Sequence, residues 1–237
     1  MIPIAEIFGP TIQGEGPNTG KKSIFVRVVG CDFDCEWCDS KFAWHKNENT
    51  IIYKEEELAV EILNRCIISN TEQVILTGGN PCLYDFDKII DLLHFNDIQV
   101  DVETQGSILP KWLNKLDLVV ISPKAPSSKQ PDVWENIYQW LQENRAIKTA
   151  IKIPVFNEED IDFVDKYYRL IISPDKFENL KLYINVGNTD TQEKEDISKR
   201  VLQDYKKLID KICKSNMKNV YVMPQMHTLV WGNKQGV

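Results

Sequence analysis

Short apolar runs alternate with stretches of helical periodicity along almost the whole chain. The apolar runs predict strands over residues 23–29, 73–76, 98–103, 118–122, 150–155, 181–186 and 220–223. Between these runs, apolar side chains recur at helical spacing over residues 58–67, 134–141 and 201–212. Strands separated by helices favour parallel βαβ units, so the pattern predicts an α/β fold. The chain shows no low-complexity linker, repeat or break in composition, and we therefore expect a single domain over residues 1–237.

The most distinctive polar and glycine-rich segments follow directly after the predicted strands. These segments are residues 30–31, 77–81, 104–106, 123–124 and 187–188. The carboxyl ends of parallel strands meet at one edge of a sheet, where α/β proteins bind their ligands. The sequence therefore predicts an active site at this edge.

Composition and charge limit the class of ligand and the compartment. The chain has 28 Lys and Arg against 35 Asp and Glu, a net charge of −7. Proteins that hold long nucleic acids usually show a basic surface, so a small-molecule ligand is favoured over nucleic acid. The chain has neither an apolar stretch of the ~18 residues that a membrane span needs nor an N-terminal export signal. We expect a cytoplasmic protein that does not enter the membrane.

Three of the six cysteines, Cys31, Cys35 and Cys38, lie within eight positions in the spacing C-x₃-C-x₂-C. In a reducing compartment such a group indicates metal or redox chemistry rather than disulfides. Soft thiolates bind zinc, copper(I) or iron–sulfur clusters. A zinc site would need a fourth ligand, for which His45 is the nearest histidine. Without a fourth ligand, an iron–sulfur cluster would keep one iron open to a substrate or cofactor. The spacing alone leaves zinc and an iron–sulfur cluster open.

The cysteine segment, with Trp37 just before its last cysteine, resembles the radical S-adenosylmethionine (SAM) superfamily. In that superfamily three cysteines hold a [4Fe-4S] cluster, and SAM chelates the fourth iron. The segment 77–81, Thr-Gly-Gly-Asn-Pro, resembles the G-G-E-P motif, whose acidic residue contacts the SAM amino group. Here Asn80 replaces the usual Glu. Its amide oxygen can accept a hydrogen bond from an ammonium, but without the added strength that a charge gives.

Further segments make the resemblance narrower and extend it from end to end. Residues 6–16, 23–30, 38–40, 102–106, 121–124 and 224–227 resemble the 7-carboxy-7-deazaguanine synthase family, in the short form of Gram-positive bacteria. The resemblance implies conversion of 6-carboxy-5,6,7,8-tetrahydropterin into 7-carboxy-7-deazaguanine with loss of ammonia, on the route to queuosine and other 7-deazapurines. It implies that a 5′-deoxyadenosyl radical, formed by reductive cleavage of SAM, takes hydrogen from C6 of the substrate, and that Mg²⁺ assists.

The same resemblance implies an architecture and partners. The expected core is an incomplete (βα) barrel of the radical SAM type, with about six parallel strands. The expected partners are a second copy in a homodimer, the pterin substrate, and a flavodoxin-like or other electron donor. Two alternatives stay open: another radical SAM enzyme, such as an activase of a glycyl-radical enzyme, and a zinc-binding or electron-transfer module.

The resemblance also implies a role in the site for individual residues of this sequence. The cluster ligands are Cys31, Cys35 and Cys38, and Ser40 stands where the family usually has a magnesium-binding Thr. The residues that match SAM contacts are Trp37, Cys38, Asp39, Gly79, Asn80, Ser122, Pro123, Lys124, Asn185 and Asn188. The residues that match substrate contacts are Ile12, Gln13, Gly14, Arg27, Thr77 and the terminal Val237. Arg27 suits the substrate carboxylate because a guanidinium donates two parallel hydrogen bonds.

Overall fold

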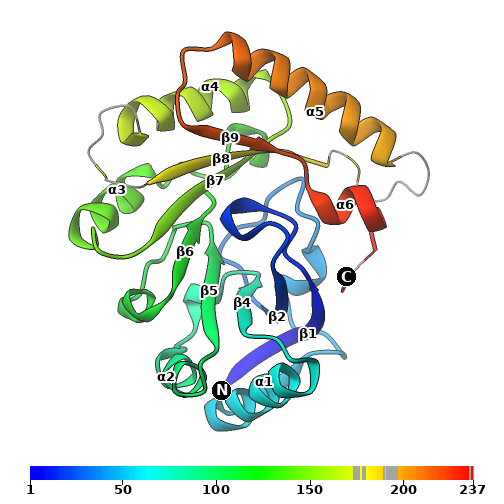
Figure 1. Ribbon diagram of the computed structural model, residues 1–237, viewed down its shortest axis with the longest axis vertical. Helices are drawn as coiled ribbons and strands as arrows, with labels where there is room; N and C mark the ends of the chain where they lie inside the picture. Colours follow the sequence, from blue (N-terminus) through cyan, green and yellow to red (C-terminus); the bar gives the residue numbers. More distant parts are fainter. Residues whose placement is uncertain (173–176, 178–179, 189, 191–196, 235, 237) are drawn as a thin grey trace.

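A nine-stranded sheet forms the centre of the computed structural model, which describes residues 1–172, 177, 180–188, 190, 197–234 and 236 (Figure 1). The strand order is β3-β1-β2-β4-β5-β6-β7-β8-β9, an open sheet whose edges are β3 and β9. Seven strands run parallel to one another: β2 (Lys22–Val28), β4 (Gln73–Gly78), β5 (Gln99–Thr104), β6 (Leu118–Ile121), β7 (Thr149–Val155), β8 (Lys181–Val186) and β9 (Val220–Met223). The predicted incomplete barrel is confirmed, with one strand more than the expected six.

Two antiparallel strands were not predicted from the apolar pattern. β1 (Ile2–Ile12) pairs with β2 and with the short β3 (Ile51–Tyr53). β1 contains Pro3, Gly9 and Pro10, and its register with β2 shifts between Phe8 and Thr11. Proline removes a backbone donor and glycine weakens strand patterns, so the sequence does not read as a continuous strand here.

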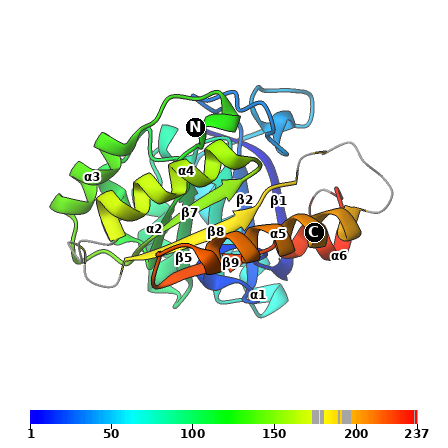
Figure 2. The same ribbon diagram turned by 90° about the horizontal axis from the view of Figure 1, so that it is seen from above.

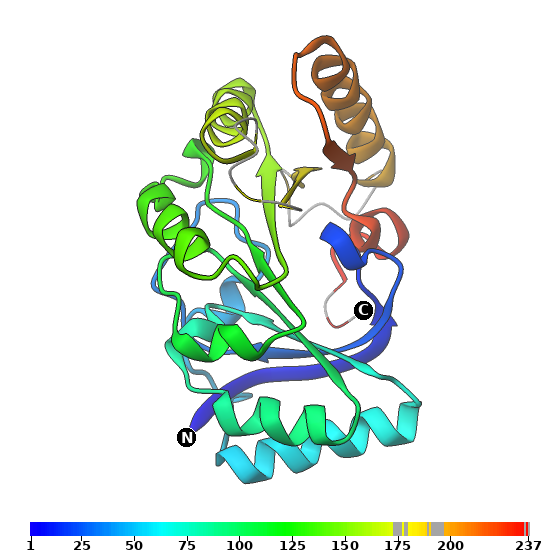
Figure 3. The same ribbon diagram turned by 60° about the vertical axis from the view of Figure 1, so that its left-hand side comes forward.

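Helices on the outside of the sheet complete the βα units. The α-helices are α1 (Glu55–Ser69), α2 (Asp87–Phe95), α3 (Trp134–Glu143), α4 (Glu158–Tyr167), α5 (Ile197–Lys214) and α6 (Met226–Trp231). The three predicted helical stretches correspond to α1, α3 and α5. α1 packs against α2 (Figure 3), and in the view from above α4 lies between α3 and α5 (Figure 2). No described helix has both the length and the apolar character that crossing a bilayer requires. Short helical turns lie at Gly16–Asn18, Lys41–Ala43, Pro81–Leu83, Lys111–Lys115, Pro126–Ser128 and Tyr168–Ile172.

The two faces of the sheet have different packing partners. Side chains such as Val102 and Ile153 point outward and join one large apolar core with the helices. The alternate side chains point into the barrel, where Val120, Ala150 and Tyr183 form a small separate cluster. Side chains alternate between the two faces along a strand, so the residue two positions after each of these also points into the barrel, nearer its carboxyl-terminal edge. This alternation directs polar residues such as Lys152 into the barrel.

The β1–β2 connection, residues 13–21, crosses the inside of the barrel. Asn18 donates a 2.5 Å hydrogen bond to Asp101 on β5, and the Gly16 N–H lies 3.1 Å from the Met223 sulfur on β9. The C-terminal segment returns beside this connection, where the Met226 N–H donates to the Gly14 carbonyl at 3.1 Å (Figure 1). These contacts link the two ends of the open sheet and form one wall of the site.

Candidate active site

A cavity of about 510 Å³ opens at the carboxyl-terminal edge of the parallel strands. Its walls come from the β1–β2 connection, the loop of residues 31–44, the ends of the central strands and the C-terminal segment. The predicted site residues that line it are Ile12, Gln13, Gly14, Arg27, Cys31, Cys35, Trp37, Cys38, Asp39, Ser40, Thr77, Gly79, Ser122, Lys124 and Asn188. The structure thus brings together segments that lie up to 176 positions apart, Ile12 to Asn188, as the strand-end pattern predicts.

The three clustered cysteines all line this cavity as free thiols. Burial raises the pKa of each thiol, that of Cys35 to about 11, while the nearby Lys124 ammonium acts in the opposite direction. A cluster would therefore displace protons when it binds. Within the described part of the chain, no three His, Cys, Asp or Glu side chains form a group that could hold one metal ion. A cluster with a separate iron for each cysteine does not require the sulfurs to meet on a single ion.

His45, the residue that could complete a zinc site, does not contribute to the cavity. Its side chain is exposed and it is absent from the cavity wall. The sulfur donors in this pocket therefore suit a three-cysteine cluster better than a four-ligand zinc site.

Gly79 brings the end of β4 into direct contact with the start of the cysteine loop. A Cβ atom at position 79 would lie 1.9 Å from the Gly30 carbonyl oxygen, so only glycine fits. Gly78 has φ +125°, which side chains rarely adopt, and its Cβ would lie 2.5 Å from the Val28 backbone. The two glycines therefore set the distance between β4 and the loop, while Asn80 is fully buried behind the cavity wall.

Trp37 is held on both its face and its edge. Its ring stacks on Phe156 with centroids 4.3 Å apart, and its indole N–H donates to the Ser127 hydroxyl at 2.9 Å. The buried Asp160 carboxylate accepts from the Ser127 hydroxyl at 2.7 Å and from the Phe156 backbone N–H at 2.8 Å. The Lys124 ammonium also lies over the Trp37 ring, with its Nζ 5.8 Å from the ring centroid. This arrangement presents an aromatic surface beside the cysteines.

The remaining residues predicted to contact SAM lie at the ends of β6 and β8. Lys124 donates to the Ser122 hydroxyl at 3.3 Å, whereas Pro123 does not line the cavity. Asn188 lines the cavity, and its backbone N–H donates to Gln225 at 3.0 Å. Asn185 is fully buried and does not line the cavity, and neither its amide nitrogen nor its amide oxygen has a hydrogen-bond partner. An orphaned buried amide is unfavourable, so this side chain has an unused capacity to pair with a ligand.

Arg27 brings a guanidinium to the cavity from β2. Its Nε donates to Glu6 at 2.8 Å and its Nη1 to the Ser40 hydroxyl at 3.0 Å. Ser40 in turn donates to Asp39 at 2.8 Å. The guanidinium lies between the rings of Phe8 and Phe42, at 5.4 Å and 5.7 Å from their centroids. These contacts fix a planar donor group at the cavity wall. The other predicted substrate contact, Val237, lies outside the described residues.

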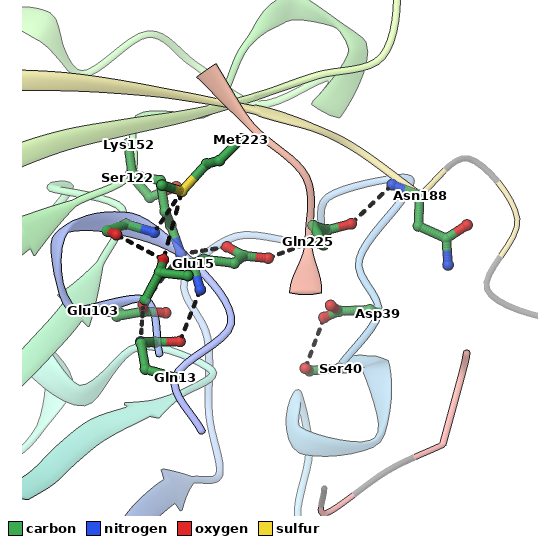
Figure 4. Close-up of polar contacts among 12 residues, drawn as sticks. Gln13, Glu15, Asp39, Ser40, Glu103, Ser122, Lys152, Asn188, Met223 and Gln225 are labelled. Carbon is green, nitrogen blue, oxygen red and sulfur yellow. Dashed lines mark hydrogen bonds and ion pairs between the residues drawn. The ribbon is translucent and has the colours of Figure 1, made fainter. Parts of the chain in front are cut away.

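Among the charged residues of the cavity that were not predicted as site residues, Glu15, Glu103 and Lys152 form one group. Lys152 places its ammonium 2.6 Å from Glu15 and 3.2 Å from Glu103 (Figure 4). Gln13 donates to Glu103 at 3.0 Å, and Gln225 donates to Glu15 at 2.6 Å. Glu15 and Glu103 occur in segments that resemble the family, but Lys152 lies in no motif. Its alternation with Ala150 and Pro154 along a predicted strand was the available indication that it faces the interior.

The pKa values of Glu15 and Lys152 are set by their contacts with each other and with neighbouring residues. Burial alone would raise the pKa of Glu15, but attraction to Lys152 and His227 and hydrogen bonds from Lys152 and Gln225 lower it to about 2. Burial opposes the charge on Lys152, yet Glu103 and Glu15 together raise the pKa of its ammonium above the usual value. Glu15 and Glu103 both line the cavity, so their carboxyl oxygens are available to a ligand there.

Comparison with known proteins identifies the family of this chain. The sequence model of the Radical SAM superfamily matches residues 25–171. The chain is 39% identical over 247 aligned residues to 7-carboxy-7-deazaguanine synthase of Bacillus subtilis (strain 168), covering 100% of this chain and 98% of that protein. The chain belongs to the 7-carboxy-7-deazaguanine synthase family. The family's protein from Bacillus cereus is 36% identical over 244 residues, covering 100% of this chain and 99% of its own.

Solved structures support the same fold. The crystal structure of QueE from Escherichia coli matches with a TM-score of 0.65 at 24% identity, over 95% of this chain and 94% of that one. SuiB from Streptococcus suis, bound to its precursor peptide, matches with a TM-score of 0.57 at 15% identity, over 84% of this chain and 48% of that one. Membership of the 7-carboxy-7-deazaguanine synthase family makes the chain a radical SAM lyase of 7-deazapurine biosynthesis that uses a [4Fe-4S] cluster and SAM.

Proposed function

We propose that the chain converts 6-carboxy-5,6,7,8-tetrahydropterin into 7-carboxy-7-deazaguanine. The observation that carries this proposal is that one cavity is lined both by the Arg27 guanidinium and by the Glu15 and Glu103 carboxylates. The substrate has a matching distribution, with a carboxylate on one ring and the N–H donors of an aminopyrimidinone on the other. Arg27 would bind the carboxylate, and the two glutamates would accept hydrogen bonds from the N–H groups.

The residues around the cysteines would hold the cofactors. Cys31, Cys35 and Cys38 are the proposed cluster ligands. Trp37 is the proposed SAM contact for which the structure offers most support, as a fixed aromatic surface that lines the cavity. Asn185, whose buried amide is unpaired, lies behind the cavity wall. When bound, the cluster and SAM supply the one-electron chemistry that removes a hydrogen atom from the substrate. The chain's own part is to orient the pterin and to exclude water from the cavity.

The same region offers oxygen atoms for a magnesium ion. Ser40 Oγ and Asp39 Oδ1 lie 2.8 Å apart, and both residues line the cavity. Mg²⁺ prefers oxygen ligands, often with one or two protein groups, waters and substrate oxygens. We propose that Ser40 binds Mg²⁺ together with the substrate carboxylate. The homodimer, the single domain, the cytoplasmic location, the identity of the electron donor and the contacts of the other site residues stay predictions.

The test is substrate selectivity in an anaerobic assay with reconstituted protein, SAM, Mg²⁺ and a chemical reductant. We compare 6-carboxytetrahydropterin with tetrahydropterin that lacks the carboxylate, and follow the products by mass spectrometry. The Arg27→Met variant should raise KM for the carboxylated substrate by about 10–100-fold, because a charged hydrogen-bonding partner contributes about 1.5–3 kcal/mol.

A matched control is Arg65→Met, which removes an arginine that also pairs with a glutamate, Glu61 at 2.7 Å, but on the outer helix α1. That variant should keep the wild-type KM. Equal turnover of the two substrates by the wild-type protein, or equal effects of the two arginine variants, would contradict the proposed substrate position.

A further inference from the structure

Asn80 occupies the position where the G-G-E-P motif usually has its SAM-binding Glu, but its surroundings differ from those of a ligand contact. The side chain is fully buried and does not line the cavity. Its Oδ1 accepts from the Cys82 backbone N–H at 3.2 Å and from the Thr104 hydroxyl at 3.0 Å. Its Nδ2 donates to Asp32 at 2.9 Å and to Ser107 at 3.3 Å. Because a primary amide has two donors and two acceptor sites, no position is left for a ligand.

Asp32, the partner of Asn80, ties the cysteine loop to the ends of two strands. It directly follows the predicted cluster ligand Cys31 in the sequence. Its Oδ1 accepts from Asn80, just beyond β4, and at 2.6 Å from Gln105, just beyond β5. A backbone bond from the Asn80 N–H to the Gly30 carbonyl, 2.7 Å long, holds the same segment from the other side.

The charge of Asp32 decides which residue position 80 can hold. The atom that faces Asp32 must be a donor, and the Nδ2 group of Asn80 is one. A glutamate at position 80 would present a carboxylate, which has no hydrogen to donate, so the hydrogen bond to Asp32 would be replaced by a contact between two carboxylates. The Asn at position 80 and the Asp at position 32 are therefore complementary.

We infer that Asn80 is a positioning residue, which holds the cysteine loop through Asp32 and leaves SAM to be bound by other residues. This inference rests on the proposed cluster ligands, and it replaces the SAM contact predicted for Asn80 from the sequence. Asp32 and Asn80 act as one matched pair in this chain, in which the carboxylate stands on the cysteine loop and the amide on the strand end.

Gln105 connects the Asn80–Asp32 pair to the cluster itself. The same amide nitrogen that donates to Asp32 lies 3.8 Å from the Cys31 sulfur, within the range of a weak N–H···S bond. Hydrogen bonds to the sulfurs of an iron–sulfur cluster help to set its reduction potential. Displacing Asp32 would release Gln105 from its present orientation. A disturbed pair should therefore change both the occupancy and the potential of the cluster.

The experiment restores the usual motif residue and then removes the charge that opposes it. We compare anaerobically reconstituted wild-type protein with Asn80→Glu and with the double variant Asn80→Glu/Asp32→Asn. The control is Asn80→Glu/Asp34→Asn, because Asp34 is an exposed carboxylate of the same loop that pairs with Gln130 instead, at 2.8 Å. Iron content, the midpoint potential from an EPR-monitored titration, and SAM affinity from the change in the EPR signal of the reduced cluster are measured for each.

Asn80→Glu should bind SAM at least about tenfold more weakly and hold less iron than the wild type, because of the like-charge contact. Asp32→Asn should restore both values to near the wild type, and Asp34→Asn should not. If Asn80→Glu does not fold, rescue is still visible as an Asn80→Glu/Asp32→Asn protein that folds and holds its iron–sulfur cluster. The inference is overturned if Asn80→Glu binds SAM as tightly as the wild type, or if the Asp34 change rescues as well as the Asp32 change. Wild-type protein that takes up no iron would instead overturn the cluster assignment itself.

Discussion

Replacement of Lys152 by Met tests the electrostatic account of the cavity. Lys152 is buried and holds Glu15 at 2.6 Å and Glu103 at 3.2 Å. The fall in the pKa of Glu15 from 4.5 to about 2 favours its charged form by on the order of 3 kcal/mol, at ~1.4 kcal/mol per pKa unit. Removing one partner of a buried ion pair costs about 3–5 kcal/mol, which agrees with that value. For a chain of this length we expect the apparent Tm to fall by about 6–12 °C.

The pKa of Glu15 also predicts how the loss of stability in Lys152→Met depends on pH. In the wild type the lowered pKa of Glu15 contributes stability above pH 4.5, which is lost as the pH falls toward about 2. In Lys152→Met, burial without the Lys152 ammonium should raise the pKa of Glu15 above 4.5, so the variant loses stability as the pH rises through that raised pKa. The difference in Tm between wild type and variant should therefore be larger at pH 7.5 than at pH 5.

The assay is thermal unfolding of the reconstituted proteins by circular dichroism, at one scan rate and at both pH values. Lys148→Met is the matched control, because Lys148 is an exposed lysine just before β7, and it should leave the Tm unchanged. Adding Glu15→Gln to Lys152→Met should recover part of the loss, since it removes an unpaired buried charge. A Tm difference under about 2 °C, or one that is the same at both pH values, would refute the reasoning.

Three further predictions concern the cofactors. Cys35→Ala should lose the cluster and all SAM cleavage, measured as iron and sulfide content, with about four of each per wild-type chain; a variant that keeps turnover would contradict the ligand assignment. Asp160→Asn should raise KM for SAM up to about tenfold while KM for the pterin stays constant, because the amide disturbs the Ser127 contact that holds Trp37; equal changes in both KM values would indicate a general structural defect. Ser40→Ala should weaken the dependence of turnover on added Mg²⁺, and an unchanged Mg²⁺ titration would exclude this hydroxyl as a ligand.

The strand-end pattern predicted most of the site because the parallel fold fixes where strand ends meet. All seven predicted strands exist, and the loops after them form the cavity wall around Cys31, Arg27 and Lys124. Once the order of strands and helices is known, the side on which the loops gather follows from the fold. The position of the site is therefore a consequence of local periodicity.

Features that depend on pairing across the barrel could not be predicted in this way. Lys152 is an ordinary lysine in the sequence, and only the approach of Glu103 on β5 and of Glu15 from the β1–β2 connection, 137 positions away, makes a buried charge tolerable there. Asn80 illustrates the opposite case, in which a motif suggested a ligand contact but partners on the cysteine loop, at the end of β5 and at Cys82 use the whole amide. Tertiary contacts of this kind are decided by long-range geometry that periodicity and spacing do not contain.

The most direct measurement of the proposed function is the ratio of product formed to SAM consumed in an anaerobic assay. The reconstituted protein is mixed with limiting SAM, Mg²⁺, a reductant and excess 6-carboxytetrahydropterin, and both products and SAM are quantified by mass spectrometry. The account predicts 7-carboxy-7-deazaguanine in clear excess over the SAM consumed, since SAM is expected to act as a reusable cofactor. Slow formation of 5′-deoxyadenosine with no deazaguanine product would contradict the proposed substrate and leave a radical SAM enzyme that acts on another molecule.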